Sequence, residues 1–378
     1  MSSDSGLPPS SIPILTSVAS YRKWRQKAFE EKKSVGFVAT MGALHDGHAS
    51  LVRHSLVDND LTVVSIFVNP AQFAPHEDLT TYPRTLPRDL EVLAALSLTT
   101  GNDLRTPSAV FLPSVHDMYP SGISQNVADQ KGTFVEVKGF SHQMEGQTRP
   151  TFFRGVSTVV TKLFNIIQVC IRCSIFAILA TDHACGLVAY TDVLRTEGYP
   201  TGPLAPANDS RFTPLPSDAR EPQYRTHSTV SRYSGSFGPV LTPQSDPITS
   251  LALSSRNAYL TQSERDIAAP KMYAAMQKVK SHWESGRNKA DSINEACAYL
   301  EKIAKDLAAQ DPTIDVKLDY IEMNDPDSFE VVPDVTTQTT WEAEAKGRPV
   351  ILSAAMWVGK TRLIDNIILG DKTLLGIL

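Results

Sequence analysis

Long apolar runs are missing from this sequence, and none approaches the ~20 residues that a membrane-spanning helix needs. Only four cysteines occur among 378 residues, which excludes a disulfide framework. A strong charge of one sign is also missing: the formal net charge is −5, which argues against a general affinity for nucleic acid or anionic membranes. Residues 1–13 have neither the apolar core of a secretory signal nor the arginine-rich character of a transit peptide. We therefore expect a cytoplasmic globular protein with no nucleic-acid or membrane partner.

The first part of the chain alternates strand and helix patterns. Short apolar strands are indicated at 34–39, 61–68 and 109–112, and helices at 89–96 and 156–167. Such alternation predicts an α/β fold with a Rossmann-like, doubly wound parallel sheet. Because a chain of this length exceeds an average domain of roughly 100–200 residues, a second domain is expected.

The C-terminal part has a different pattern, typical of a smaller α+β domain. Helices are indicated at 264–280 and 290–309, strands at 316–323 and 349–356, and an exposed loop at 334–347.

Between these parts, the periodicity disappears. Nine of the 25 prolines lie between residues 199 and 250, and a structureless stretch of this length is unusual inside a compact domain. We expect a first domain at 1–246, within which 169–246 is anomalous and lacks a single packed structure, and a second domain at 247–378.

A His45-Asp46-Gly47-His48 motif follows the strand at 34–39 and opens a helix. A helix N-terminus offers free N–H groups and the positive end of a dipole, which suit a phosphate. Histidines at this place can donate hydrogen bonds to phosphoryl oxygens. The alternative is a solvated turn that happens to contain two histidines.

Two further motifs carry polar groups at suitable places. Ser254-Ser255-Arg256 begins the second part of the chain, where hydroxyls and a guanidinium could bind a triphosphate, although an ordinary helix start has the same pattern. Asn69 and Gln72 follow the strand at 61–68, and ligands of parallel sheets bind beyond the carboxyl ends of strands. These two side chains could bind a small polar substrate or satisfy a turn.

These motifs lie in longer blocks that together resemble the pantothenate synthetase (pantoate–β-alanine ligase) family, within the HxGH nucleotidylyltransferase superfamily. The blocks occur in the family's order at 38–48, 67–73, 82–85, 110–113, 149–150, 153–165, 251–260 and 357–366.

The resemblance implies ATP-dependent ligation of pantoate and β-alanine through a pantoyl adenylate, with release of AMP and pyrophosphate. His48 would be the acid that assists departure of pyrophosphate, with His45 beside it, and Asn69 and Gln72 would hold pantoate. Mg²⁺ is expected with the nucleotide, and a homodimer is expected from the family. The residues implied to bind ATP are Met41, Gly42, Ala43, Leu44, His45, Asp46, Gly47, His48, Leu253, Ser254, Ser255 and Arg256.

One block of the family is missing. After the helix at 153–165 the family carries FGxKD and two glutamines, whose lysine and aspartate serve ATP and magnesium. Here Val-Cys-Ile-Arg-Cys follows Gln168. The replacement contains a possible zinc set made of Cys170, Cys173, His183 and Cys185.

We favour a reading-frame explanation over the zinc site or a genuine insertion. Codons for 168–170 can contain GTATGT, which resembles the start of an intron. Codons for 192–208, read in a shifted frame, can spell Tyr-Phe-Gly-Gln-Lys-Asp, which is the missing block. On this hypothesis 169–188 and about 230–244 are translated intron, and the residues between them are exon in the wrong frame.

Two other functions stay open from the sequence. A non-catalytic relative that binds nucleotide or pantoate would explain the missing block. Another HxGH nucleotidylyltransferase, such as a cytidylyltransferase, would share the first motif but not the Asn-Pro-Ala-Gln-Phe block at 69–73 or the Trp-Val-Gly-Lys-Thr-Arg-Leu ending at 357–363.

Overall fold

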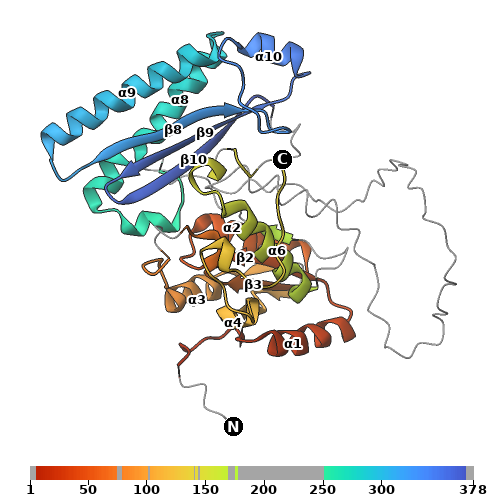
Figure 1. The fold of residues 1–378 in the computed structure, drawn as a ribbon. Coiled ribbons are helices and arrows are strands. Elements are labelled where there is room, and N and C mark those ends of the chain that lie inside the picture. Colours follow the sequence, from red (N-terminus) through yellow and green to blue (C-terminus); the bar gives the residue numbers. More distant parts are fainter. Residues whose placement is uncertain are drawn as a thin grey trace, which may run out of the picture.

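A five-stranded parallel sheet forms the centre of the N-terminal unit, residues 6–177 (Figure 1). The computed structural model describes residues 6–74, 79–100, 103–139, 141–143, 145–168, 175–177 and 251–371. The strand order is β1-β6-β3-β2-β7, so the chain moves outward from β2 on one side and returns to its other side with β7. The strands are β1 (Ile14–Leu15), β2 (Val35–Thr40), β3 (Leu61–Ile66), β6 (Ala109–Phe111) and β7 (Ile175–Ala177). This arrangement confirms the predicted doubly wound fold and places the switch point of the sheet beside β2.

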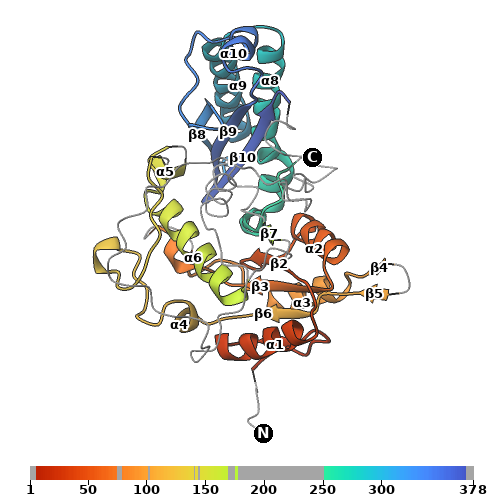
Figure 2. The ribbon, with the colours of Figure 1, turned by 90° about the vertical axis from the view of Figure 1, so that its right-hand side faces the viewer.

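Helices cover both faces of this sheet because its strands are apolar on both sides. On β2, Phe37 packs with α1 (Val18–Glu30) and α6 (Phe152–Ile167), whereas Val38 packs with α2 (Asp46–Asp58) and α3 (Leu86–Ala94). The same alternation continues through the neighbouring strands, since successive side chains of a strand point to opposite faces. The N-terminal unit therefore has two hydrophobic cores, one on each face of the sheet. Figure 2 shows the helices of this unit around the central strands β2, β3 and β6.

Shorter elements connect the main ones. They are η1 (Pro70–Gln72), β4 (Leu98–Thr100), β5 (Asp103–Arg105), α4 (Val115–Met118), η2 (Val127–Asp129) and α5 (Glu145–Thr148). The connections that follow β2, β3 and β6 all leave from the carboxyl edge of the sheet, where they can combine into one site.

A three-stranded antiparallel sheet with order β10-β9-β8 forms the C-terminal unit, residues 251–371. The long helices α8 and α9 pack against one face, which β9 supplies with Leu352, Ala354, Met356 and Val358. The elements are η3 (Ser255–Tyr259), η4 (Glu264–Ala268), α8 (Pro270–Glu284), α9 (Lys289–Gln310), β8 (Val316–Asn324), α10 (Gln338–Glu344), β9 (Val350–Val358) and β10 (Thr361–Leu369).

The other face of this small sheet contacts the N-terminal unit. Ile351 and Ile368 are cross-strand partners in β9 and β10, and both join the hydrophobic cluster that contains α1 and α6. Phe329, from the loop after β8, is buried in the same cluster and has a left-handed backbone with φ +57°. The side-chain amide of Gln143, oriented with its nitrogen toward this loop, donates to the Phe329 carbonyl at 2.9 Å.

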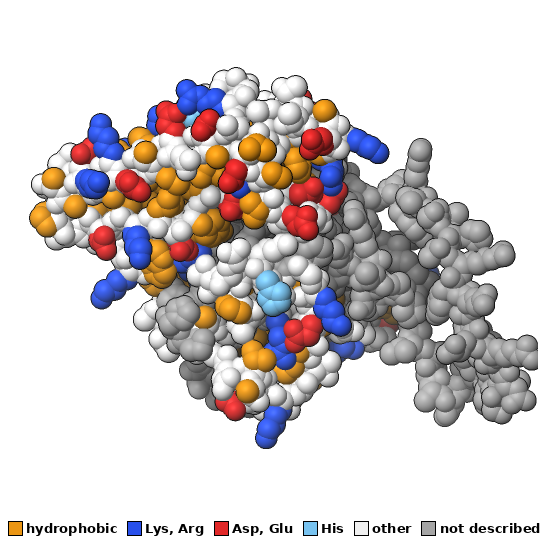
Figure 3. Space-filling view, turned by 45° about the horizontal axis from the view of Figure 1, so that its top comes forward, with side chains coloured by type: hydrophobic (Ala, Val, Ile, Leu, Met, Phe, Trp, Pro, Cys, Tyr) orange, Lys and Arg blue, Asp and Glu red, His pale blue; other side chains and the backbone are white. Residues whose placement is uncertain are grey.

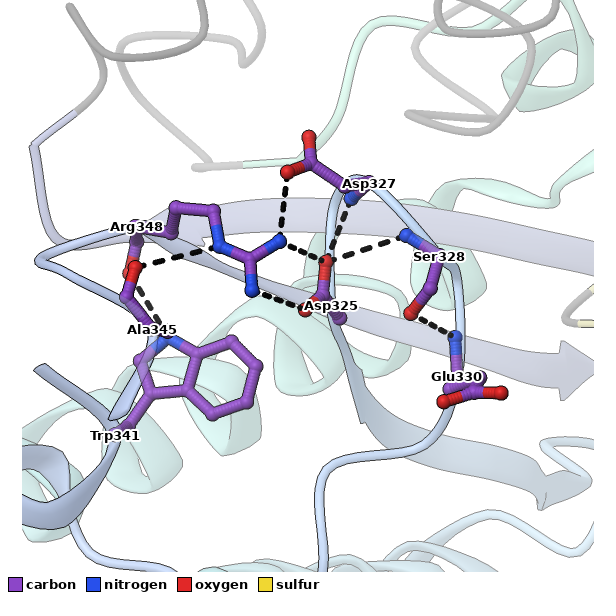
Figure 4. A network of polar contacts seen from close by, with 7 residues as sticks. All are labelled: Asp325, Asp327, Ser328, Glu330, Trp341, Ala345 and Arg348. Carbon is purple, nitrogen blue, oxygen red and sulfur yellow. Dashed lines mark hydrogen bonds and ion pairs between the residues drawn. The ribbon is translucent and has the colours of Figure 1, made fainter.

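An ion-pair network shapes the loop that carries Phe329 (Figure 4). Arg348 pairs with Asp325 at 3.2 Å and with Asp327 at 2.6 Å. The Asp325 side chain also accepts the Asp327 backbone N–H at 2.7 Å. The network therefore ties the start of β9 to the loop that contacts the N-terminal unit.

Two expectations need correction. Residues 334–347 are not simply an exposed loop, because α10 forms at Gln338–Glu344. The Trp341 side chain is buried there, and its indole N–H donates to the Arg348 carbonyl at 2.8 Å, a tertiary contact that a seven-residue polar helix needs. Within 169–246, Ile175–Ala177 forms strand β7, although the whole segment was expected to lack packing. The other residues of 169–246 lie outside those described, as does the proposed zinc set.

Among the described helices, none is both long enough and apolar enough to cross a membrane.

Candidate active site

The loop after β2 is held in place by a buried carboxylate. Asp89, which is 1% exposed in the first turn of α3, accepts the Ala43 N–H at 3.0 Å and the Leu44 N–H at 2.8 Å. Ala43 has a left-handed backbone with φ +49°, and Gly42 before it has φ +85°. A β-carbon at Gly42 would lie 3.1 Å from the Asp89 carboxylate. Glycine and the carboxylate together allow the tight turn that leads into α2.

The two histidines stand at the N-terminus of α2. His45 is the N-cap residue, and its backbone N–H donates to Nδ1 of His48 at 3.3 Å. Because Nδ1 of His48 accepts this bond, the proton of a neutral His48 is on Nε2. The two rings lie 4.1 Å apart, and Nδ1 of His45 is buried with no hydrogen-bond partner among the described residues. The pair therefore offers an N–H donor and an unused ring nitrogen at a helix N-terminus.

Burial keeps both imidazoles neutral near pH 7. Desolvation lowers the pKa of His45 to about 4, against a smaller opposing effect of Asp46. The pKa of His48 is also well below its usual range, chiefly through desolvation and then through the neighbouring His45. In this structure His48 is a neutral hydrogen-bond donor rather than an imidazolium.

The 69–72 turn follows β3 at the same edge of the sheet. Gln72 donates from Nε2 to Sδ of Met41 at 3.1 Å, which joins this turn to the loop after β2. Asn69 is 1% exposed, and its side-chain amide is hydrogen-bonded to Gln72, Gly155, Ala71 and Tyr119. Direct contact of Asn69 with a substrate would require one of these bonds to open.

The Ser254–Arg256 motif begins the C-terminal unit and touches the N-terminal unit. Ser254 caps the 3-10 helix η3 by accepting the Arg256 N–H at 3.2 Å. Ser255 forms a 2.7 Å hydroxyl–hydroxyl hydrogen bond with Tyr82, a buried residue 173 positions earlier. This bond brings the second motif to the N-terminal unit.

A cavity of about 660 Å³ lies between the two units near this contact. Its cationic lining comes from Arg149, Arg256, Lys360 and Arg362, of which Arg362 is paired with Asp319 at 2.7 Å. Arg149 also donates to the Gln72 carbonyl at 3.1 Å. The full lining is Thr81, Thr148, Arg149, Arg256, Tyr259, Glu264, Thr313, Trp357, Gly359, Lys360, Thr361 and Arg362. Cations and hydroxyls of this kind suit a phosphorylated ligand.

The face in Figure 3 shows Lys and Arg side chains interspersed with Asp and Glu, without a continuous field of one sign.

No group of three or more His, Cys, Asp or Glu side chains that could hold a metal ion occurs in the described part of the chain. The buried carboxylate of Asp89, beside the loop after β2, already accepts two backbone N–H groups. The described residues therefore do not form a cage for a divalent cation.

The family model described as pantoate-beta-alanine ligase matches residues 13–174 and 244–368. The chain belongs to this family. Its match breaks at 175–243, inside the segment where the sequence departs from the family pattern.

Whole-chain relatives of the ligase family agree with this assignment. The chain is 33% identical to a pantoate–beta-alanine ligase of Saccharomyces cerevisiae, over 95% of this chain and 100% of the relative. It is 34% identical to a pantothenate synthetase of Thermotoga neapolitana, over 94% and 99% of the two chains. The ligase family comprises enzymes, and this chain is one of its members.

Solved structures of the ligase family share the fold. The pantothenate synthetase of Thermus thermophilus has a TM-score of 0.62 and 27% identity, over 94% of this chain and 99% of that chain. A pantoate–beta-alanine ligase from Francisella tularensis has a TM-score of 0.60 and 23% identity, over 95% and 98%.

Sequence reasoning missed several residues that the structure joins to the site. The sequence marks Asp89 only as the start of a helix, and because the helix dipole favours acids in a first turn, nothing in the sequence signals that this one is buried. Tyr119 and Arg149 had no role assigned. An aromatic residue shortly after a parallel strand was the available signal for Tyr119. Arg149 and Lys360 lie in the family blocks at 149–150 and 357–366, but neither of them was assigned a role from the sequence.

Proposed function

We propose that this chain joins pantoate and β-alanine into pantothenate at the expense of ATP. The pantoate carboxylate attacks the α-phosphorus, the bond to the leaving phosphate breaks, and pyrophosphate departs. The amine of β-alanine then attacks the acyl carbon of pantoyl adenylate, loses a proton and displaces AMP. The Francisella tularensis relative is described as complexed with beta-gamma ATP and beta-alanine, two ligand types that this reaction uses.

The observation that carries the proposal is the fixed Nε2–H of His48 at the N-terminus of α2. A preorganised donor at such a place stabilises charge that grows on phosphate oxygens as pyrophosphate leaves. His48 performs this role as a neutral imidazole. The negative charge of a bound nucleotide would raise the pKa of His48 and so favour the protonated form that can act as an acid. His45, whose buried Nδ1 has no partner among the described residues, would donate a ring N–H to the same phosphates.

Other residues bind and orient the reactants in this proposal. Met41–His48 line the ATP site, and Gln72 binds pantoate, with Asn69 behind it. Leu253–Arg256 close over the triphosphate as part of a C-terminal lid at 247–378. The cavity lined by Arg149, Arg256 and Lys360 supports this arrangement, because it offers positive charge between the two units.

Three finer points rest on the family resemblance. Mg²⁺ would enter with the triphosphate, whose oxygens supply much of its coordination. We also propose a homodimer and a cytoplasmic location.

The test is a direct assay of the purified chain with pantoate, β-alanine and ATP. Pantothenate, AMP and pyrophosphate should form in equal amounts, with no ADP, as followed by mass spectrometry. Without β-alanine, pantoyl adenylate should accumulate on the protein. Binding of ATP and pantoate without turnover would instead identify a non-catalytic relative. Pyrophosphate release that does not depend on pantoate would indicate another nucleotidylyltransferase.

A further inference from the structure

A chain of buried hydrogen bonds leads from Tyr119 to Gln72. Tyr119 follows α4 beyond the carboxyl end of β6 and is 3% exposed. Its hydroxyl donates to Oδ1 of Asn69 at 2.8 Å, and Nδ2 of Asn69 donates to Oε1 of Gln72 at 3.1 Å. Three side chains from the connections after β3 and β6 are thus linked in sequence at the edge of the sheet that carries the site.

Two backbone groups that cannot change roles select the orientation of the Asn69 amide, and the shorter bond from the Tyr119 hydroxyl, at 2.8 Å, holds Oδ1 in place. The Ala71 backbone N–H, which can only donate, lies 3.3 Å from Oδ1. The Gly155 carbonyl, which can only accept, lies 3.1 Å from Nδ2. A β-carbon at Gly155 would overlap the Ala71 carbonyl, so α6 packs directly against the turn. If the Asn69 amide were rotated, its NH₂ group would face the Ala71 N–H and its oxygen would face the Gly155 carbonyl, so both hydrogen bonds would be lost.

The orientation of Asn69 is passed to Gln72. Because Nδ2 of Asn69 donates to Oε1, the Gln72 amide turns its Nε2 away from Asn69, toward Sδ of Met41 at 3.1 Å. A thioether is a weak acceptor, so an oxygen of a bound ligand replaces it at little cost. Arg149 holds the backbone of Gln72 by donating to its carbonyl at 3.1 Å.

The Tyr119 hydroxyl keeps its proton, because desolvation raises its pKa above the usual range. Its hydrogen bond to Asn69 has a smaller opposing effect.

We propose that Tyr119 is a positioning residue that holds Asn69 in place and thereby keeps Gln72 oriented as a hydrogen-bond donor to an oxygen of the substrate acid. The proposal rests on the function proposed above and deepens it. Nε2 of Gln72 donates to an acceptor oxygen of the substrate, which is a carboxylate or a hydroxyl oxygen. Asn69 is then a positioning residue as well, and it transmits orientation rather than touching the substrate.

Tyr119→Phe removes only the hydroxyl. The loss of one hydrogen bond of this kind should raise the pantoate KM and the calorimetric pantoate Kd about 3- to 10-fold, with kcat little changed. In a Gln72→Ala background the same substitution should have no further effect, because Tyr119 acts through Gln72. Tyr21→Phe is the matched control: Tyr21 is fully buried and its hydroxyl donates to the Ile167 carbonyl at 3.2 Å, outside the proposed chain. It should lower the melting temperature without changing pantoate affinity.

A second variant tests polarity without touching the buried core. Gln72 is partly exposed, so Gln72→Glu should fold while presenting an acceptor in place of the donor. It should weaken pantoate binding more than Gln72→Ala does.

Several results would overturn the proposal. These are an unchanged pantoate Kd in Tyr119→Phe, an equal effect of Tyr119→Phe with and without Gln72, or wild-type affinity in Gln72→Glu. A protein that binds pantoate but forms no pantothenate would refute the proposed function, while Kd would still decide the role of Tyr119. No pantoate binding by the unaltered protein would refute both.

Discussion

Replacing the buried Asp89 by asparagine tests whether this carboxylate holds the loop that leads to the two histidines. Its oxygens accept the N–H groups of Ala43 and Leu44 at 3.0 and 2.8 Å, and the Thr85 hydroxyl at 3.2 Å. An amide has one oxygen, so one of the two backbone N–H groups would face an NH₂ group. The substitution preserves shape and removes one acceptor.

The magnitude follows from that lost acceptor. A buried donor left without a partner costs about 1–3 kcal/mol. Ala43, at φ +49°, holds a conformation that costs a non-glycine residue roughly 1–2 kcal/mol, which favours relaxation of the loop once it is released. Because about 1.4 kcal/mol corresponds to tenfold in rate, kcat/KM for ATP should fall about 5- to 150-fold.

The assay is pantoate-dependent release of pyrophosphate with ATP varied, together with thermal unfolding. Asp60→Asn is a matched control, because Asp60 accepts the Ser34 N–H at 2.8 Å at the opposite edge of the sheet. The control should lose some stability and keep its ATP kinetics. Wild-type kcat/KM for ATP in Asp89→Asn would refute the reasoning, as would an equal loss in both variants.

His48→Ala should slow formation of pantoyl adenylate by roughly 10²–10³ with the fold intact, whereas Gln72→Ala should mainly raise the pantoate KM. Pre-steady-state assays separate these effects, and a wild-type rate of adenylation in His48→Ala would exclude the assigned role. The pKa of His45 is about 4 in the folded protein and near 6.5 when unfolded, so the unfolded chain binds more protons between these values. The contribution of His45 to stability should therefore fall as the pH drops from about 6.5 to 4, by roughly 2 kcal/mol at pH 5. His45→Gln should make the profile shallower in denaturant titrations without abolishing it, because His48 acts in the same direction. For the anomalous segment, we expect spliced mRNA that lacks the codons for about 169–188 and encodes Tyr-Phe-Gly-Gln-Lys-Asp downstream. Sequencing of cDNA decides this, and mass-spectrometric peptides from 192–208 in the printed frame would contradict it.

Periodic apolar patterns predicted several main elements of the fold, although helix α1 and strand β10 were not predicted. The run at 61–68 is strand β3 at Leu61–Ile66, and the pattern at 156–167 is α6 at Phe152–Ile167. Both elements are buried, and their packing requires apolar side chains at the positions where the sequence pattern has them. The local pattern and the tertiary environment therefore agree. By contrast, α10 was missed because its one buried side chain, Trp341, finds its partner only in the folded unit.

The candidate site divides in the same way. The chain itself determined which chemical groups follow each strand, because the HxGH motif and the Asn-Pro-Ala-Gln-Phe block are contiguous in sequence. The shared edge of the sheet could also be predicted, since parallel strands place their following loops at one edge, whereas the strand order came from the structure.

Only the tertiary structure decided how those groups act. The proton on Nε2 of His48, the orientation of the Asn69 amide and the contact of Ser255 with Tyr82 depend on atoms from separate elements. Tyr119 and Asn69 are 50 positions apart, and Tyr82 and Ser255 are 173 apart. A hydrogen bond has a direction set by both partners, and burial changes a pKa through all surrounding atoms. Residue types alone therefore specify which donors and acceptors are available, and packing specifies which way each of them points.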